Sequence, residues 1–198
     1  MRQKELYPFW HKIGDCEFSL EGGIYPDEIG FVSFTQSCPI CVLNSLKEAE
    51  GKDILIHVDS PGGDQFTGVS IAYAVKSYPG KVTVRVKPYG SAASAASFLL
   101  LAADEIEMYP SSHVLLHPAR VQVYATGDVL IKMGTLLKEN DKQTILDFVR
   151  HLRDPALKDE LQKAFYEERN LSAEEVSRFF DVKILEEKST GAEAGETL

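Results

Sequence analysis

The chain has 198 residues, of which 44% are hydrophobic and 26% are charged, and this balance excludes wholesale disorder and fibrous structure. The 30 acidic residues against 21 basic ones give a net charge of −9, which argues against nucleic-acid binding because that binding rests on clustered positive charge. The 3 cysteines are few and odd in number, so we expect a reducing compartment and no disulfide scaffold.

The amino-terminal segment has no continuous apolar core of the kind that secretory signals carry. The longest run of small and apolar residues, 92–103, is far shorter than the roughly 20 residues that span a bilayer. We therefore expect a cytoplasmic protein that does not enter a membrane.

The predicted elements of the first two thirds alternate between strand and helix. In chain order they are a strand at 16–20, a helix at 39–50 capped by Ser37, a strand at 54–58 covered on both faces and followed by a turn at 60–63, a helix at 67–78, a strand at 82–86, a helix at 94–103, and short strands at 105–108 and 114–116. This order is typical of an α/β fold with a mostly parallel sheet and crossover helices.

The last third is predicted to be helical. Asp128 is the expected N-cap of a long helix that ends near Leu152. Asp154 and Pro155 begin the next helix, and Ser172 with Glu175 forms a capping box for the last one. Residues 189–198 are small and acidic and are predicted to be a disordered tail.

Ser94 stands where a strand and turn enter a helix, within the run Gly-Ser-Ala-Ala-Ser-Ala-Ala-Ser at 90–97. Small neighbours allow close backbone approach, and a helix N-terminus offers unpaired N–H groups that favour a developing oxyanion. On its own, the run fits a tightly packed Ala/Ser helix at least as well as an active site.

Two other segments could complete such a site. The glycine pair at 62–63 ends a buried strand, where it permits positive φ and exposes N–H groups to a ligand, although most Pro-Gly-Gly segments are simple turns. His117 follows a short strand at the carboxyl edge of the predicted sheet and could act as the base for a serine. A lone histidine at a strand end is more often structural.

Together, these segments resemble the Clp protease proteolytic-subunit family, the ClpP-like serine peptidases of crotonase-type fold, and within it the phage head-maturation (prohead) branch. The resemblance rests on VDSPGGD at 58–64, GSAASAAS at 90–97, AADEIEMYPSSHVLLHPA at 102–119 and NLSAEE at 170–175, and it extends over about 17–187. It implies a single domain at 1–188, with an α/β core at 16–120 and a projecting handle with C-terminal helices at 121–188.

The resemblance implies Ser94 as nucleophile, His117 as base, and the backbone N–H groups of Gly63 and Ala95 as oxyanion hole. Such a site performs acyl transfer on peptide bonds without a metal, a nucleotide or another cofactor. The family carries an aspartate as the third catalytic residue, and Glu168 stands at that position here, with a side chain one methylene longer. Glu167 is the neighbouring alternative, and both carboxylates could instead be solvated helix-end charges.

The resemblance also implies polypeptide substrates, phage head proteins among them, cleaved inside a homo-oligomeric ring, as a heptamer or tetradecamer. Apolar residues around much of the helix at 128–152 independently predict a partner subunit, because one core covers only one side of a helix. The amino-terminal segment does not match the loops that dock unfoldase ATPases, so an ATPase partner stays an open question. Residues 119–127 replace a glycine-rich strand of the family, and we expect them still to form a strand.

Three alternatives stay open at this point. A Ser–Lys dyad would use Lys132 or Lys138, although the Leu-Leu-His-Pro run at 115–118 favours the histidine. A crotonase-type acyl-CoA-binding protein would use the same N–H pair without a nucleophile, and a catalytically inactive subunit would only build the ring. The pair Cys38 and Cys41 resembles a redox or metal motif but has no second ligand pair, so we interpret it as part of a helix.

Overall fold

The computed structural model describes residues 10–24 and 39–187 of the chain. The expected cap at Ser37, the side chains of the Cys38/Cys41 pair and the tail at 189–198 lie outside this description.

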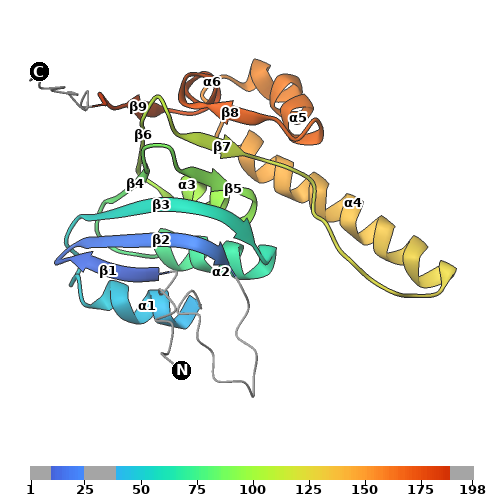
Figure 1. The fold of residues 1–198 in the computed structure, drawn as a ribbon, viewed down its shortest axis with the longest axis horizontal. Helices are drawn as coiled ribbons and strands as arrows, with labels where there is room; N and C mark the ends of the chain where they lie inside the picture. Colours follow the sequence, from blue (N-terminus) through green and yellow to red (C-terminus); the bar gives the residue numbers. More distant parts are fainter. Residues whose placement is uncertain (1–9, 25–38, 188–198) are drawn as a thin grey trace, which may run out of the picture.

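The described chain forms one curled, mostly parallel sheet (Figure 1). Its first part has the order β1-β2-β3-β4-β6-β9, with β1 (Trp10–Gly14), β2 (Glu17–Ile24), β3 (Ile54–Gly63), β4 (Val82–Val86), β6 (Glu105–Met108) and β9 (Val182–Ile184). The second part begins at the end of β3, where Ser60 pairs with Ala92, and continues through β5 (Ser91–Ala93), β7 (His113–Leu115) and β8 (Asn170–Ser172). Among the strands of the described ranges, only the pairs β1–β2 and β7–β8 are antiparallel.

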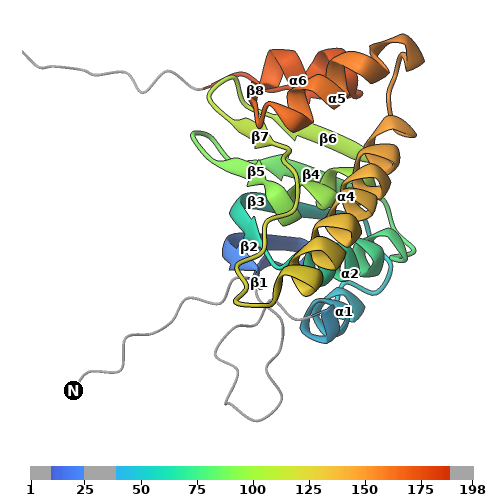
Figure 2. The ribbon, with the colours of Figure 1, turned by 90° about the vertical axis from the view of Figure 1, so that its right-hand side faces the viewer.

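Helices cover one face of this sheet. Figure 2 shows the strands as a layer with α1 (Pro39–Lys47) and α2 (Gln65–Lys76) on the same side. Ile54, Ile56 and Val58 of β3 point into the core, whereas Leu55 and His57 between them are only half-buried. The strand at 54–58 was therefore predicted in the right place, but the prediction that both of its faces are covered is wrong.

The face opposite the helices carries a row of charged side chains. His57, Arg85, Glu107 and Lys183 occupy matched positions on four neighbouring strands. Arg85 lies 2.6 Å and Lys183 2.7 Å from carboxylate oxygens of Glu107. Burial alone would raise the pKa of Glu107, but the hydrogen bonds from Lys183 and Arg85 outweigh it and lower that pKa.

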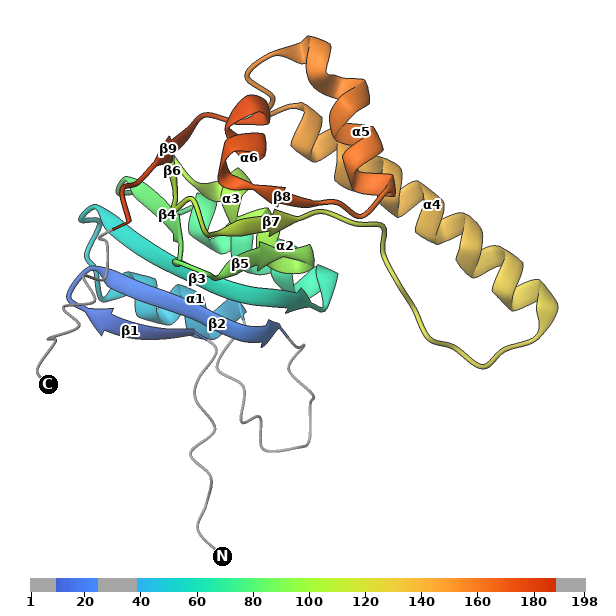
Figure 3. The same cartoon turned by 45° about the horizontal axis from the view of Figure 1, so that its top comes forward.

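The carboxy-terminal third projects from this body. The amino-terminal part of helix α4 (Gly127–Val149) extends beyond the sheet (Figure 3). Helices α5 (Lys158–Tyr166) and α6 (Ala173–Phe179) lie near the carboxyl end of α4. The rings of Phe98 and Phe148, 5.7 Å apart, join the carboxyl end of α4 to α3 (Phe98–Ala102). The capping box is confirmed: the Ser172 hydroxyl accepts from Glu175 N–H, and the Glu175 carboxylate accepts from Ser172 N–H.

Several local predictions are wrong in detail. The segment at 60–63 is the end of β3 rather than a turn, because pairing with Gly23 and Ile24 of β2 extends the strand. The helix predicted at 94–103 is a 3₁₀ turn, Ser94–Ser97, followed by α3. The N-cap of α4 is Thr126 rather than Asp128, which lies in the first turn, where the helix dipole favours a carboxylate. Residues 119–126 form no strand.

Acid should weaken the fold through His57. Burial and the neighbouring Arg85 charge lower the pKa of His57, although Glu17, with its carboxylate 3.8 Å from Nε2, opposes this. The unfolded chain then binds more protons than the folded one below the ordinary histidine value of about 6.5, so stability falls as the pH falls through that value. We expect the unfolding free energy from urea titration to drop between pH 7 and 5.5, and His57→Gln to flatten this slope. Equal slopes in both proteins would contradict the assignment.

Candidate active site

Ser94 is held in an unusual backbone conformation at the junction of β5 and the 3₁₀ turn. Its φ is +53°, whereas Ala93 before it is extended. A serine in such a strained strand-to-helix turn presents its hydroxyl outward, as nucleophiles do in hydrolases built on a similar turn. The neighbouring alanines, Ala93 and Ala95, are buried while Ser94 stays half-exposed. The alanines thus provide the packing, and the serine faces the open side.

The glycines of β3 lie directly against this turn. A Cβ on Gly62, whose φ is +83°, would stand 2.4 Å from the Ala93 carbonyl oxygen and 2.6 Å from Ser94 Cβ. A Cβ on Gly68 of α2 would likewise stand 2.7 Å from the Ala95 carbonyl oxygen. No side chain larger than hydrogen fits at these two positions without displacing the backbone that carries Ser94. The glycine segment and the serine segment are therefore in contact, as the sequence predicted.

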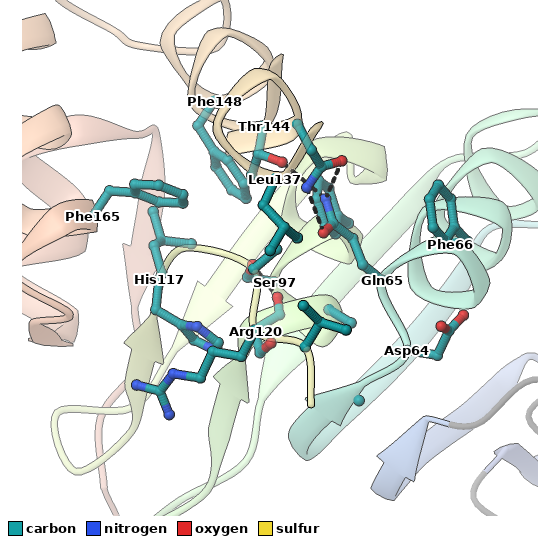
Figure 4. A pocket seen from close by; sticks show the side chains of 18 of the residues that line it. Asp64, Gln65, Phe66, Ser97, His117, Arg120, Leu137, Thr144, Phe148 and Phe165 are labelled. Atoms are coloured by element: carbon teal, nitrogen blue, oxygen red, sulfur yellow. Dashed lines mark hydrogen bonds between the residues drawn. The ribbon is translucent and has the colours of Figure 1, made fainter. Parts of the chain in front are cut away.

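A cavity of about 440 Å³ opens beside Ser94 (Figure 4). Gly63, Ala95 and His117 line the same cavity, so the structure brings together four of the five predicted site residues. Most of the remaining lining is apolar, with Phe66, Phe98, Leu116, Val121, Leu136, Leu137, Phe148 and Phe165. A mostly apolar cavity that also carries polar groups suits the side chain of a bound organic substrate.

His117 lies two residues beyond β7, and its Nδ1 is 2.7 Å from the carbonyl oxygen of Pro118. A carbonyl oxygen can only accept a hydrogen bond, so Nδ1 carries the proton and the neutral ring keeps Nε2 free as an acceptor. That tautomer is the one a general base needs when it takes a proton from a serine hydroxyl.

Glu168 lies in the turn between α5 and β8 with a φ of +54°. Its carboxylate pairs with Arg120, and both side chains are substantially exposed. The neighbouring Glu167 faces Lys163, 3.8 Å away. Within the described ranges, Nδ1 of His117 is thus bonded to a backbone carbonyl and Glu168 to a guanidinium. The assignment of Glu168 as the residue that orients His117 stays a prediction.

The lysines of the alternative dyad lie elsewhere. Lys132 and Lys138 are exposed on α4, and neither lines the cavity beside Ser94. In residues 10–24 and 39–187, no group of three or more His, Cys, Asp or Glu side chains is arranged to hold a metal ion. None of the helices in those ranges is long and apolar enough to cross a membrane.

Sequence reasoning missed two polar residues at the cavity and one buried acid of α4. Gln65 is the first residue of α2, two residues after Gly63, and it bonds to Thr144, 2.9 Å away, and to Asn140 of α4, 2.8 Å away. Arg120 lines the cavity three residues after His117. Asp141 is only 8% exposed. A sequence signal existed for Asp141, because Asp141, Ile145 and Phe148 recur at helical spacing and share the buried face of α4.

Comparison with known proteins gives two findings. A family model described as Clp protease matches residues 35–179, which include Ser94, His117 and Glu168. The ATP-dependent Clp protease proteolytic subunit 2 of Treponema denticola is 41% identical over 68 residues. That alignment covers 33% of this chain and 33% of the relative, so it spans about a third of the length of each.

The fit between the glycine segment and the serine turn predicts a large difference between two glycine substitutions. Gly62→Ala places a methyl group against Ala93 and Ser94 at positive φ, and we expect it to lower the unfolding free energy by about 2 kcal/mol or more. Gly134→Ala is the matched control, because nothing lies within 4 Å of a Cβ there and α4 should gain about 0.5–1 kcal/mol. Urea titration measures both, and equal effects would contradict the close approach.

Proposed function

The chain belongs to the Clp protease family, and we propose that it is a serine endopeptidase that uses Ser94 and His117. The observation that carries this proposal is the placement of a half-exposed Ser94, at positive φ, in one cavity with His117. The hydrogen bond from Nδ1 to the Pro118 carbonyl supports His117 as the base, because it leaves Nε2 free to accept a proton.

The proposed reaction is acyl transfer in two steps. Ser94 Oγ attacks the peptide carbonyl carbon while His117 Nε2 takes the hydroxyl proton. The carbonyl oxygen becomes negative and is held by the N–H groups of Gly63 and Ala95, which line the same cavity. His117 then returns the proton to the leaving amine, and water, activated by the same imidazole, hydrolyses the acyl-enzyme.

We further propose that the protein acts as a homo-oligomeric ring, a heptamer or a tetradecamer. The amino-terminal half of α4 and the segment before it expose apolar side chains that the described chain leaves uncovered, among them Val121, Val123, Leu130, Ile131 and Leu136. Such a surface favours a partner subunit. The sequence likeness to the phage head-maturation branch supports capsid or scaffold polypeptides as substrates.

A catalytically inactive ring subunit is the second candidate function. It is favoured by the pairing of Glu168 with Arg120, because Nδ1 of His117 then bonds to the Pro118 carbonyl and, in the described residues, to no carboxylate. The two candidates differ in the reactivity of Ser94.

Ser94 should be labelled by a fluorophosphonate probe, which reacts only with activated serine hydroxyls. We expect Ser94→Ala to abolish labelling, and His117→Ala to slow it by about 10³-fold or more because the base is lost. Mass mapping locates the label, and Ser91→Ala, three residues before Ser94, is the matched control that should keep wild-type labelling. An unlabelled wild-type protein would support the inactive subunit, and undiminished labelling of His117→Ala would refute the histidine.

Glu168 is kept in the proposed site as the group that neutralises Arg120. We expect Glu168→Gln to lower kcat about tenfold. A wrong histidine tautomer would cost roughly 10⁴-fold, but the Pro118 carbonyl sets the correct tautomer without Glu168. Peptide-hydrolysis kinetics measure the change, and Glu167→Gln serves as the control with unchanged kcat. A loss of 10³-fold or more would mean that Glu168 itself orients His117.

A further inference from the structure

The segment that carries His117 has no regular structure of its own. Residues 116–126 are neither helix nor strand. In the described chain, one hydrogen bond ties the backbone of residues 118–125 to another element, and it runs from the Ala119 N–H to Asp141 Oδ1, 2.8 Å away. His117 is therefore held between β7, which ends two residues before it, and a contact made two residues further along the chain.

Asp141 is a costly residue to place at this point. It is 8% exposed on the inward face of α4, where Ile145 and Phe148 are also buried. Removing a carboxylate from water is unfavourable unless hydrogen bonds to the charged form compensate. The Ala119 N–H supplies such a bond, and a bond of this charge-assisted kind is about twice as strong as a neutral one.

The same helix also holds the oxyanion side of the cavity. The Gln65 side-chain amide donates to Thr144 Oγ1 at 2.9 Å, and its carbonyl accepts from Asn140 Nδ2 at 2.8 Å. Figure 4 shows Gln65 reaching across to Thr144 on α4. Gln65 is the first residue of α2 and stands two residues after Gly63, so one turn of α4 contacts both the helix that follows the proposed oxyanion strand and the segment that carries the base.

We propose that Asp141 is a positioning residue, which fixes the place of His117 in the cavity that Ser94 lines by accepting the Ala119 N–H. Asn140 and Thr144 act in parallel on the oxyanion strand through Gln65. This proposal rests on the proposed peptidase function. A displacement of about 1 Å can cost about 10²-fold in rate, so loss of the Asp141 bond should lower kcat while leaving KM nearly unchanged.

The test compares substitutions at two aspartates of α4. Asp141→Leu removes the acceptor, and we expect kcat to fall between tenfold and 100-fold at constant KM. Asp141→Asn keeps an acceptor oxygen at the same place and should stay within about twofold of the wild type. Asp147→Leu is the matched control and should also stay within about twofold. In the described part of the chain, the Asp147 side chain bonds to Gln143 of its own helix and to Arg150 directly after it, and to neither the His117 segment nor α2.

Each outcome decides the proposal. Equal kcat values for Asp141→Leu and Asp147→Leu would overturn it. An Asp141→Asn variant as slow as Asp141→Leu would also overturn it, because the negative charge of Asp141, and not its hydrogen bond, would then determine kcat. If Asp141→Leu does not fold by circular dichroism, Thr144→Val takes its place, with an expected tenfold loss of kcat at constant KM and no loss overturning the proposal. If the fluorophosphonate does not label Ser94 in the wild type, the peptidase function itself is refuted. If it labels Ser94 but kcat is unchanged in the Asp141 variants, only the positioning role is refuted.

Discussion

The contact between the end of β3 and the turn at Ser94 is the constraint on which the rest of the site depends. Gly62 is buried, and its missing side chain leaves room for the Ala93 carbonyl and for Ser94 itself. Ser60, fully buried two residues earlier, donates to the Gly22 carbonyl at 2.5 Å and accepts from the Gly62 N–H at 3.1 Å. These bonds hold the glycines in the strand, so the segment that we propose as part of the oxyanion hole belongs to the sheet and is pre-organised.

The sequence predicted the parts of the fold that local chemistry decides. The strand at 82–86, the strand at 105–108 and the capping box at Ser172 are as expected, because each carries its own periodicity or its own cap. Four strands were not predicted: β1, β5, β8 and β9, of which β5, β8 and β9 have three residues each. They exist because a neighbouring strand pairs with them, and such pairing leaves little mark on a short stretch of sequence.

The difference between features set by local chemistry and features set by long-range contacts also applies to the site. Ser94, His117 and the glycine pair could be found because their residue types and the turn chemistry around them are unusual, and the resemblance to a family assigned their roles. The partners of the ionisable groups could not be found in this way. Arg120 and Glu168 are 48 residues apart in the chain, and Ala119 and Asp141 are 22 apart. Those contacts arise only when α4 and α5 fold back over the strands, so the structure and not the residue order decides them.

The electrostatics of the proposed base combine one local contact with one of those long-range contacts. The Pro118 carbonyl on Nδ1 sets the tautomer of His117, but it carries no full charge to stabilise the imidazolium that the proposed reaction would form. Arg120 lines the same cavity, and an unopposed guanidinium there would disfavour a second positive charge. Glu168 pairs with Arg120 and so offsets the charge of the guanidinium. In the proposed mechanism, Glu168 therefore acts on the base through Arg120 and not by direct contact.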